Sequence, residues 1–186
     1  MALEREVKLR FDSPEAARAA VGRLGVTPLR GRRLQEDCLL DDAAETLRQR
    51  RCVLRVRKEG NRSLLTYKGP VQPGPMKLRE EHETVAADGD TLLTILAELG
   101  LRPWFRYEKY REEFAAEDAV IAIDETPVGT YVEIEGGEAH ITELAAALGF
   151  APGDYITDSY RTVYLQHCEA HDVPPRDMLF PTRLSR

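Results

Sequence analysis

Cysteine, lysine and long apolar runs are all scarce in this sequence of 186 residues. The three cysteines, Cys38, Cys52 and Cys168, are odd in number and show no CxxC spacing, which argues against a disulfide framework and against a structural zinc site. We therefore expect three small buried residues in a protein kept in a reducing compartment.

No run approaches the ~18 apolar residues of a membrane-spanning helix, and the sequence is charged from its fourth residue. These features predict a cytoplasmic protein with no membrane partner. The formal net charge of −6 argues against a general nucleic-acid partner, because a nucleic-acid backbone calls for a broad basic surface. A focused cationic pocket is still compatible with this charge. The length suits one domain with a substantial core.

Charged residues alternate along the first predicted strand, where Glu4, Glu6 and Lys8 stand two positions apart. Side chains two apart on a strand share a face, although a solvent-exposed face would show the same pattern. The Glu-x-Glu spacing recurs at Glu81/Glu83 and at Glu133/Glu135. Each copy precedes a helical segment that ends in Leu-Gly, at Leu24-Gly25, Leu99-Gly100 and Leu148-Gly149.

Cap, turn and periodicity signals predict about eight strands, mostly in hairpin order, with helices inserted between them. Strands are expected over residues 3–11, 32–40, 51–58, 62–68, 77–87, 103–114, 119–125 and 129–135. Helices are expected over residues 14–24, 43–49, 91–99, 141–148 and 159–168. The Pro174-Pro175 pair marks a flexible tail, so we expect one domain over residues 1–170 and a tail over residues 171–186.

One face of the predicted sheet is charged, while the opposite face is largely apolar. The charged face carries Glu4, Glu6, Lys8, Arg55, Arg57, Lys68, Arg79, Glu81, Glu83, Lys109, Arg111, Glu133 and Glu135. If the helices cover the apolar face from outside, the charged face must point inward. The sequence therefore predicts an α+β fold: a closed antiparallel β-barrel of about eight strands around a charged tunnel, with helices packed outside.

The enclosed acids and bases have two interpretations. They could simply pair with one another, because an unpaired buried charge is costly. Alternatively, the cations bind phosphate oxygens and the carboxylates bind a hard divalent cation such as Mg²⁺. A metal-bound polyphosphate would satisfy both sets of charges at once.

A series of motifs in the same order resembles the CYTH superfamily, the triphosphate tunnel enzymes. It begins with the ExExK signature at residues 4–8 and continues through Leu54-Arg55-Val56-Arg57, Leu65-Thr66-Tyr67-Lys68-Gly69-Pro70, Lys77-Leu78-Arg79-Glu80-Glu81-His82-Glu83, Lys109-Tyr110-Arg111 and Ile123-Asp124-Glu125-Thr126 to Glu133-Ile134-Glu135. The resemblance spans residue 3 to about residue 168. It is greatest to the branch of class IV adenylyl cyclase-like proteins.

This resemblance implies roles for individual residues. It implies that one or two Mg²⁺ or Mn²⁺ ions bind to Glu4, Glu6, Glu81, Glu83, Asp124, Glu133 and Glu135. It implies that a triphosphate binds to Lys8, Arg55, Arg57, Lys68, Arg79, Lys109 and Arg111, and that the catalytic residues are Glu4, Glu6, Lys8 and Lys109. Several family members carry a functional lysine on the closing helix, but no lysine follows Lys109 here. Either Arg161 substitutes for it or that contact is missing.

The activity that the resemblance favours is that of an adenylyl cyclase, which converts ATP to cAMP and pyrophosphate. A triphosphatase acting on inorganic triphosphate, thiamine triphosphate or a nucleoside triphosphate is the first alternative. A module that binds polyphosphate or a nucleotide without turnover is the second. The sequence contains no identifiable set of residues that would read adenine. A homodimer is compatible with the sequence, which indicates no interface.

Overall fold

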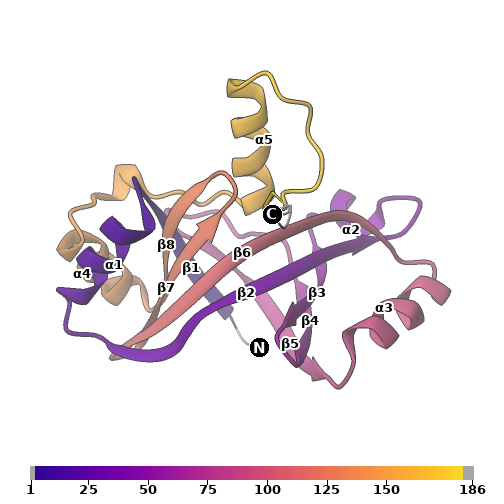
Figure 1. Cartoon of the computed structure of the whole chain (residues 1–186), viewed down its shortest axis with the longest axis horizontal. Helices are drawn as coiled ribbons and strands as arrows, with labels where there is room; N and C mark the ends of the chain where they lie inside the picture. Colours follow the sequence, from indigo (N-terminus) through magenta and orange to yellow (C-terminus); the bar gives the residue numbers. More distant parts are fainter. Residues whose placement is uncertain (1–2, 182–186) are drawn as a thin grey trace, which may run out of the picture.

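The computed structural model describes residues 3–181, and eight strands in this part of the chain close into an antiparallel barrel (Figure 1). Around the barrel the strands follow the order β1-β5-β4-β3-β2-β6-β7-β8. The strands are β1 (Leu3–Phe11), β2 (Thr27–Asp41), β3 (Val53–Glu59), β4 (Arg62–Lys68), β5 (Lys77–Ala86), β6 (Arg102–Ala116), β7 (Ala119–Thr126) and β8 (Gly129–Gly136). The predicted fold class is confirmed.

Five α-helices and one short 3-10 helix lie outside the described barrel. They are α1 (Pro14–Gly22), α2 (Thr46–Gln49), α3 (Gly89–Glu98), α4 (Glu138–Ala147), α5 (Tyr160–Ala170) and η1 (Pro152–Asp154). Local signals explain the boundaries of α1: the Ser13 hydroxyl accepts a hydrogen bond from the amide of Ala16 at 3.1 Å, and Pro14 occupies the first turn. Gly25, Gly100 and Gly149 follow α1, α3 and α4 with φ of 70°, 86° and 90°, the left-handed conformation that glycine favours.

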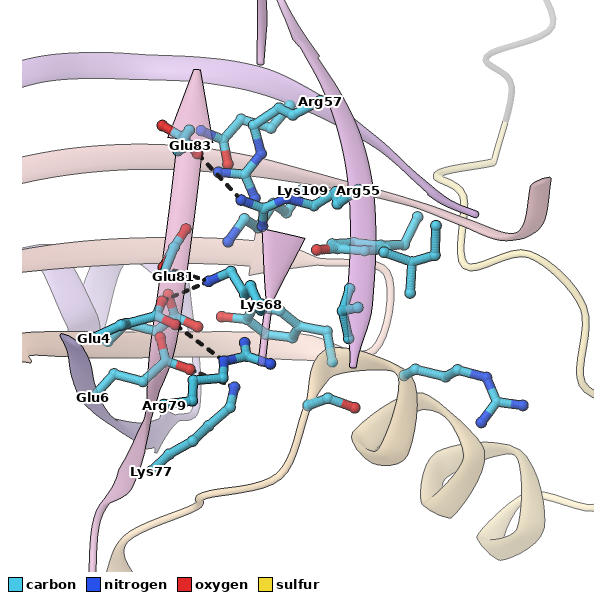
Figure 2. Close-up of a pocket in the computed structure, with 18 of the residues that line it drawn as sticks. Glu4, Glu6, Arg55, Arg57, Lys68, Lys77, Arg79, Glu81, Glu83 and Lys109 are labelled. Carbon is cyan, nitrogen blue, oxygen red and sulfur yellow. Dashed lines mark hydrogen bonds and ion pairs between the residues drawn. The ribbon is translucent and has the colours of Figure 1, made fainter. Parts of the chain in front are cut away.

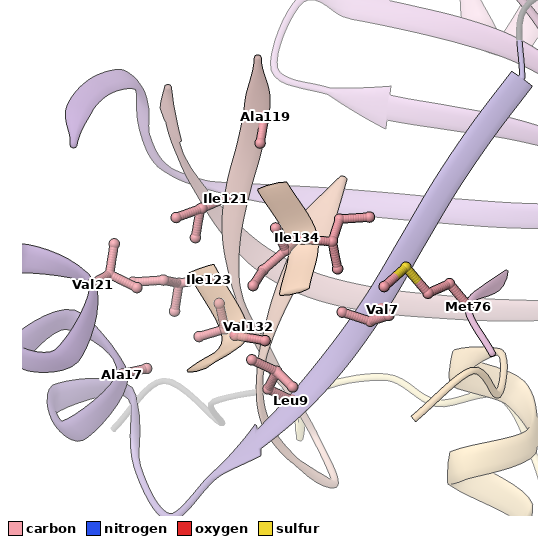
Figure 3. Close-up of a cluster of buried hydrophobic side chains, with 12 residues drawn as sticks. Val7, Leu9, Ala17, Val21, Met76, Ala119, Ile121, Ile123, Val132 and Ile134 are labelled. Atoms are coloured by element: carbon pink, nitrogen blue, oxygen red, sulfur yellow. The ribbon is translucent and has the colours of Figure 1, made fainter. Parts of the chain in front are cut away.

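The apolar face of the barrel points outward and is covered by helices. At one end α1 and α4 pack on β1, β7 and β8, and Figure 3 shows the resulting cluster around Val7, Ile121, Ile123 and Ile134. At the other end α3 packs on β3 and β4. Each fully buried aliphatic side chain of this kind contributes about 1.5–3 kcal/mol to the free energy of unfolding. With the apolar surface buried outside, the other face of every strand is left to line the interior.

The segment after α5 corrects the sequence prediction of a tail that leaves the fold. β7 pairs with β6 from Tyr110 to Ala116, and the C-terminal segment pairs with the stretch of β6 before it. The amide of Met178 donates to the carbonyl of Arg106, and the amide of Glu108 donates to the carbonyl of Met178, both at 2.9 Å. Pairing with this edge of β6 and burial of Met178 explain why the segment stays on the barrel. Residues 182–186 of the predicted tail lie outside the described residues.

Met178 offers a direct test of this docking. Its side chain is 1 % exposed and packs with Phe105, Tyr107 and Tyr164. We expect Met178→Ala to lower the free energy of unfolding by about 2–3 kcal/mol, because it leaves a cavity under α5. Leu179, which is 44 % exposed, is the matched control: Leu179→Ala should cost about 0.5 kcal/mol or less. Equal effects of the two variants in denaturant titrations would contradict the docked arrangement.

No helix within residues 3–181 has the length and apolar character that crossing a membrane requires. The three cysteines are buried and free, as the sequence predicted.

Candidate functional site in the barrel interior

The three Glu-x-Glu segments lie on adjacent strands. β1 pairs with β5 on one side and with β8 on the other, so Glu4/Glu6, Glu81/Glu83 and Glu133/Glu135 form one continuous wall of the interior. On the opposite part of the barrel, β3 and β6 carry Arg55 and Arg57, and Lys109 and Arg111. Figure 2 shows carboxylates of β1 and β5 close to lysines and arginines of β3, β4, β5 and β6 in the same interior space.

These side chains surround a cavity of about 890 Å³. Twelve lysines and arginines and eight glutamates line it, so the lining carries a positive excess within a protein whose net charge is negative. The predicted site residues that line it are Glu4, Glu6, Lys8, Arg55, Arg57, Lys68, Arg79, Glu81, Glu83, Lys109, Arg111, Glu133, Glu135 and Arg161. The strand register thus brings the predicted rows together around one space that can accept an anion.

Strand register places acids directly opposite bases, which stabilises a sheet when the charges are opposite. Seven such cross-strand pairs form salt bridges of 2.5–3.1 Å: Glu4–Arg79, Glu6–Lys77, Lys8–Glu133, Arg30–Glu113, Lys68–Glu81, Asp37–Arg57 and Asp124–Arg111. The interior is therefore neutralised largely by its own side chains. An anion that enters the cavity must compete with these carboxylates for the hydrogen-bond donors of the lysines and arginines.

Asp124 lies behind the cavity lining. Its side chain is fully buried, and its carboxylate accepts hydrogen bonds from Lys109 Nζ at 2.8 Å and Arg111 Nε at 2.7 Å. Tyr160 of α5 donates its hydroxyl to the same carboxylate at 2.6 Å. Burial raises the pKa of Asp124, but Arg111 and Lys109 outweigh that effect and hold the pKa below its usual value. Asp124 is thus an ionised anchor for two cations of the tunnel.

Several interior groups titrate away from their usual ranges. Burial, together with the charge of Arg111, lowers the pKa of Lys109 to about 8. Burial and the charge of Lys8 lower the pKa of Lys77 to about 8. Desolvation, followed by the charges of Glu4 and Glu6, raises the pKa of Glu135 to about 7. Such shifts are common where charged groups of one sign are held close together.

Arg161 lines the cavity at its edge rather than reaching the ion-pair network. Its guanidinium carbon lies 4.8 Å from the centre of the Trp104 ring, and that of Arg48 lies 4.5 Å from the same ring. No salt bridge to Arg161 is found within residues 3–181. The closing-helix residue that enters the network is its neighbour Tyr160.

Sequence reasoning left several residues out of the candidate site, and three of them, Lys77, Asp37 and Tyr160, belong to the network of ion pairs and hydrogen bonds described above. Lys77 lies two positions before Arg79 on the same face of its strand, so the alternating pattern could have identified it as a site residue. Asp37 binds Arg57 through two hydrogen bonds of 2.8 and 3.2 Å, and the alternation of β2 gave only a weak signal for it. Tyr160 contacts a residue 36 positions away, which no local pattern reveals.

The carboxylates do not form a ready-made metal cage. Within residues 3–181, no group of three or more carboxylate, histidine or cysteine side chains comes together as metal ligands. The donor chemistry nevertheless suits a hard cation, because Glu4, Glu81 and Glu135 repel one another. The pKa of Glu81 is raised by burial and by Glu4, and that of Glu135 is raised by desolvation and by the other carboxylates. A divalent cation would relieve this repulsion. Which carboxylates bind metal stays a prediction.

Comparison with known proteins gives a consistent result. The family model described as "CYTH domain" matches residues 2–152. A protein of Methanocaldococcus jannaschii named "Putative adenylate cyclase MJ0240" is 28 % identical over 142 residues, which cover 76 % of this chain and 81 % of that protein.

Solved structures share the fold. The structure of a Vibrio parahaemolyticus protein described as "a putative adenylate cyclase" superposes with a TM-score of 0.76 at 20 % identity, covering 87 % of this chain and 97 % of that one. That of a Hippeastrum protein, described as a "putative adenylyl cyclase" with a dominant triphosphatase activity, gives a TM-score of 0.69 at 19 % identity, covering 88 % of this chain and 95 % of that one. At these identities the likeness establishes the shared barrel.

Proposed function

The chain belongs to the CYTH domain family, and from this premise we propose that it is a divalent-metal-dependent enzyme that acts on a triphosphate inside its barrel. The activity we favour is that of a class IV adenylyl cyclase-like enzyme, which converts ATP to cAMP and pyrophosphate. The name of the Methanocaldococcus jannaschii relative supports this choice.

One observation carries the proposal: cations and carboxylates from the walls of a closed barrel converge on a single cavity of about 890 Å³. Arginine binds phosphate oxygens in a bidentate manner, and lysine binds them as a compact charge. The lining has more cations than acids, so an entering polyanion improves its charge balance. Neutralising and positioning a phosphate chain is most of what phosphoryl transfer requires of a protein.

In the cyclase reaction, the 3′-hydroxyl oxygen of the ribose forms a bond to the α-phosphorus. The bond from that phosphorus to the oxygen bridging the β-phosphorus breaks, and pyrophosphate leaves with the bonding electrons. Arg55, Arg57 and Arg111 would stabilise the negative charge that develops on the leaving group. Lys109 Nζ, whose pKa is lowered to about 8, is our candidate to accept the hydroxyl proton in the molecules in which its amine is neutral.

We propose that Mg²⁺ or Mn²⁺ binds to the wall formed by β8, β1 and β5. The predicted ligands are Glu4, Glu6, Glu81, Glu83, Glu133 and Glu135 of this wall, together with Asp124 of β7, which would have to give up hydrogen bonds from Lys109 and Arg111 to bind the ion. When bound, the ion would polarise phosphate oxygens and neutralise their charge. The lysines between the carboxylates, Lys8 and Lys68, would then be released from their salt bridges and become available to the substrate.

Triphosphate hydrolysis is the alternative activity. Ion-paired lysines and arginines line the cavity, and these cations can bind phosphates whatever the phosphates are attached to. The triphosphatase activity described for the Hippeastrum protein points the same way. In this reaction a water oxygen would form a bond to the terminal phosphorus of inorganic triphosphate, thiamine triphosphate or a nucleoside triphosphate. The bond from that phosphorus to its bridging oxygen would break, so that orthophosphate and the diphosphate are released.

A single product analysis separates these activities. The protein is incubated with Mg²⁺ or Mn²⁺ and with either ATP or tripolyphosphate, and cAMP, pyrophosphate and orthophosphate are quantified. We expect cAMP and pyrophosphate in equal amounts from ATP. Orthophosphate without cAMP would establish the triphosphatase instead. Binding of either compound without any product would contradict an enzymatic role and leave a binding module.

A further inference from the structure

Tyr160 brings α5 into the charged network of the barrel. It is the first residue of the helix, directly after the Ser159 cap, and its side chain lines the cavity although it belongs to an element outside the barrel. The residue is only 6 % exposed. Within residues 3–181, no other side-chain hydrogen bond joins α5 to a strand. The remaining contacts of α5 with the barrel are mostly apolar and aromatic, through Val163, Tyr164 and Cys168.

The hydroxyl of Tyr160 is a donor to an oxygen that other groups share. It donates to Asp124 Oδ2 at 2.6 Å, the oxygen that also accepts from Lys109 Nζ at 2.8 Å and from Arg111 Nη2 at 2.5 Å. A phenol is neutral at neutral pH, so the hydroxyl is the donor in this hydrogen bond. A hydrogen bond from a neutral donor to a buried carboxylate is among the stronger kinds.

The ring of Tyr160 also lies among the cations of the cavity. Lys109 Nζ is 4.8 Å and Lys8 Nζ is 5.2 Å from its centre, within the range of a cation–π contact. One side chain of α5 therefore contacts an acid of β7 and lysines of β1 and β6.

We propose that Tyr160 is a positioning residue of the tunnel: its hydroxyl holds Asp124, and through it Lys109 and Arg111, in the arrangement that accepts an anion, while the same contact fixes α5 across the barrel. This inference rests on the proposed binding of a triphosphate in the cavity. The physical reason is competition for one oxygen. When the phenol donates a hydrogen bond to Oδ2, that oxygen binds Lys109 and Arg111 less tightly. The two cations can then donate some of their hydrogen bonds to a phosphate. Without the phenol, Asp124 would hold both cations more tightly.

The substitution Tyr160→Phe removes the hydroxyl and keeps the ring. Tyr131→Phe is a matched control, because Tyr131 lies with its ring centre 5.6 Å from that of Tyr160 and its buried hydroxyl has no hydrogen-bond partner among the described residues. Binding of tripolyphosphate is measured by calorimetry without divalent metal, so that no turnover is needed. We expect about tenfold weaker binding in Tyr160→Phe and a change of less than about twofold in Tyr131→Phe, given the strength of a hydrogen bond to a charged group.

In the steady state, Tyr160→Phe should raise KM about tenfold and lower kcat by a smaller factor, because the phenol positions Lys109 and Arg111 without itself touching the reacting atoms. Binding of tripolyphosphate by Tyr160→Phe as tightly as by the wild type would overturn the proposal. An equal loss in Tyr131→Phe would also overturn it, because the effect would then come from repacking. If the wild type binds tripolyphosphate but turns nothing over, the proposed enzymatic function fails while this binding comparison still decides the role of Tyr160.

A second measurement does not depend on any ligand. Amide hydrogen exchange is compared between the wild type, Tyr160→Phe and Tyr131→Phe. The α5 amides from Val163 to Cys168 should exchange at least about tenfold faster in Tyr160→Phe only, while those of β1 and β8 stay unchanged. Unaltered exchange in α5 would show that the phenol does not hold the helix, and would overturn that part of the proposal even if the wild type binds no triphosphate.

Discussion

Replacing Glu133 with glutamine is expected to lower turnover of the triphosphate substrate about a hundredfold or more while the protein stays folded. Glu133 is 7 % exposed and forms salt bridges with Lys8, at 3.1 Å, and with Arg111. The substitution removes one charge from the proposed metal-binding wall, and losses of this size are typical when one preorganised charged group is deleted. The fold should persist, because Lys8 keeps Glu6 and Arg111 keeps Asp124 as partners.

Glu138→Gln is the matched control, since Glu138 lies exposed in the first turn of α4 and does not line the cavity. It should keep full activity. Glu6→Gln should behave like Glu133→Gln. Circular dichroism and thermal unfolding establish that each variant is folded before its kinetics are compared. Unchanged turnover in both Glu133→Gln and Glu6→Gln would contradict a role for these carboxylates in metal binding.

Replacing Asp37 with asparagine is expected to lower the free energy of unfolding by about 3 kcal/mol. Asp37 is 2 % exposed and binds both Nε and Nη2 of Arg57, and Arg55 Nε lies 3.4 Å from the same carboxylate. Removing one partner of a buried ion pair leaves the other charge uncompensated, which is among the costliest single changes. Denaturant titration of the wild type, Asp37→Asn, Arg57→Gln and the double variant gives the coupling energy directly. Additive effects would mean that the pair contributes nothing.

The same carboxylate predicts a pH dependence. Burial raises the pKa of Asp37, but Arg57 and Arg55 outweigh burial, and the pKa in the folded state lies below its usual value of 3.8. The stability that Asp37 contributes is therefore present above that value and is lost as the pH falls through the lower pKa of the folded state. Asp37→Asn should lose this part of the acid sensitivity. Asp118→Asn, in the exposed turn between β6 and β7, should retain it.

The barrel and most of its lining were predictable from the sequence because both follow from strand alternation. Side chains alternate between the two faces of a strand, so Glu4, Glu6 and Lys8 share one face regardless of which strands lie beside them. The apolar residues on the opposite face indicated which side of the sheet the helices cover. Convergence of the three Glu-x-Glu segments then required only that β1 lie between β5 and β8, and the structure has this arrangement.

The remaining features depend on contacts between distant residues. The orientation of Asp124 was ambiguous next to a turn and is settled by its pairing with Arg111 across β6 and β7. Tyr160 enters the cavity because of where α5 docks. The C-terminal segment looked flexible from its prolines, yet Met178 is held by an edge of β6 that β7 leaves free. Local sequence carries no signal for such an edge.

A crystal structure with tripolyphosphate and Mg²⁺ tests the central claim most directly. The account predicts phosphate oxygens within hydrogen-bond distance of Arg55, Arg57 and Lys109 inside the barrel, and the metal ion on the carboxylates of β1, β5 or β8. Tripolyphosphate bound on the outer surface, with the salt bridges of Glu4, Glu6 and Asp124 still intact inside, would contradict it.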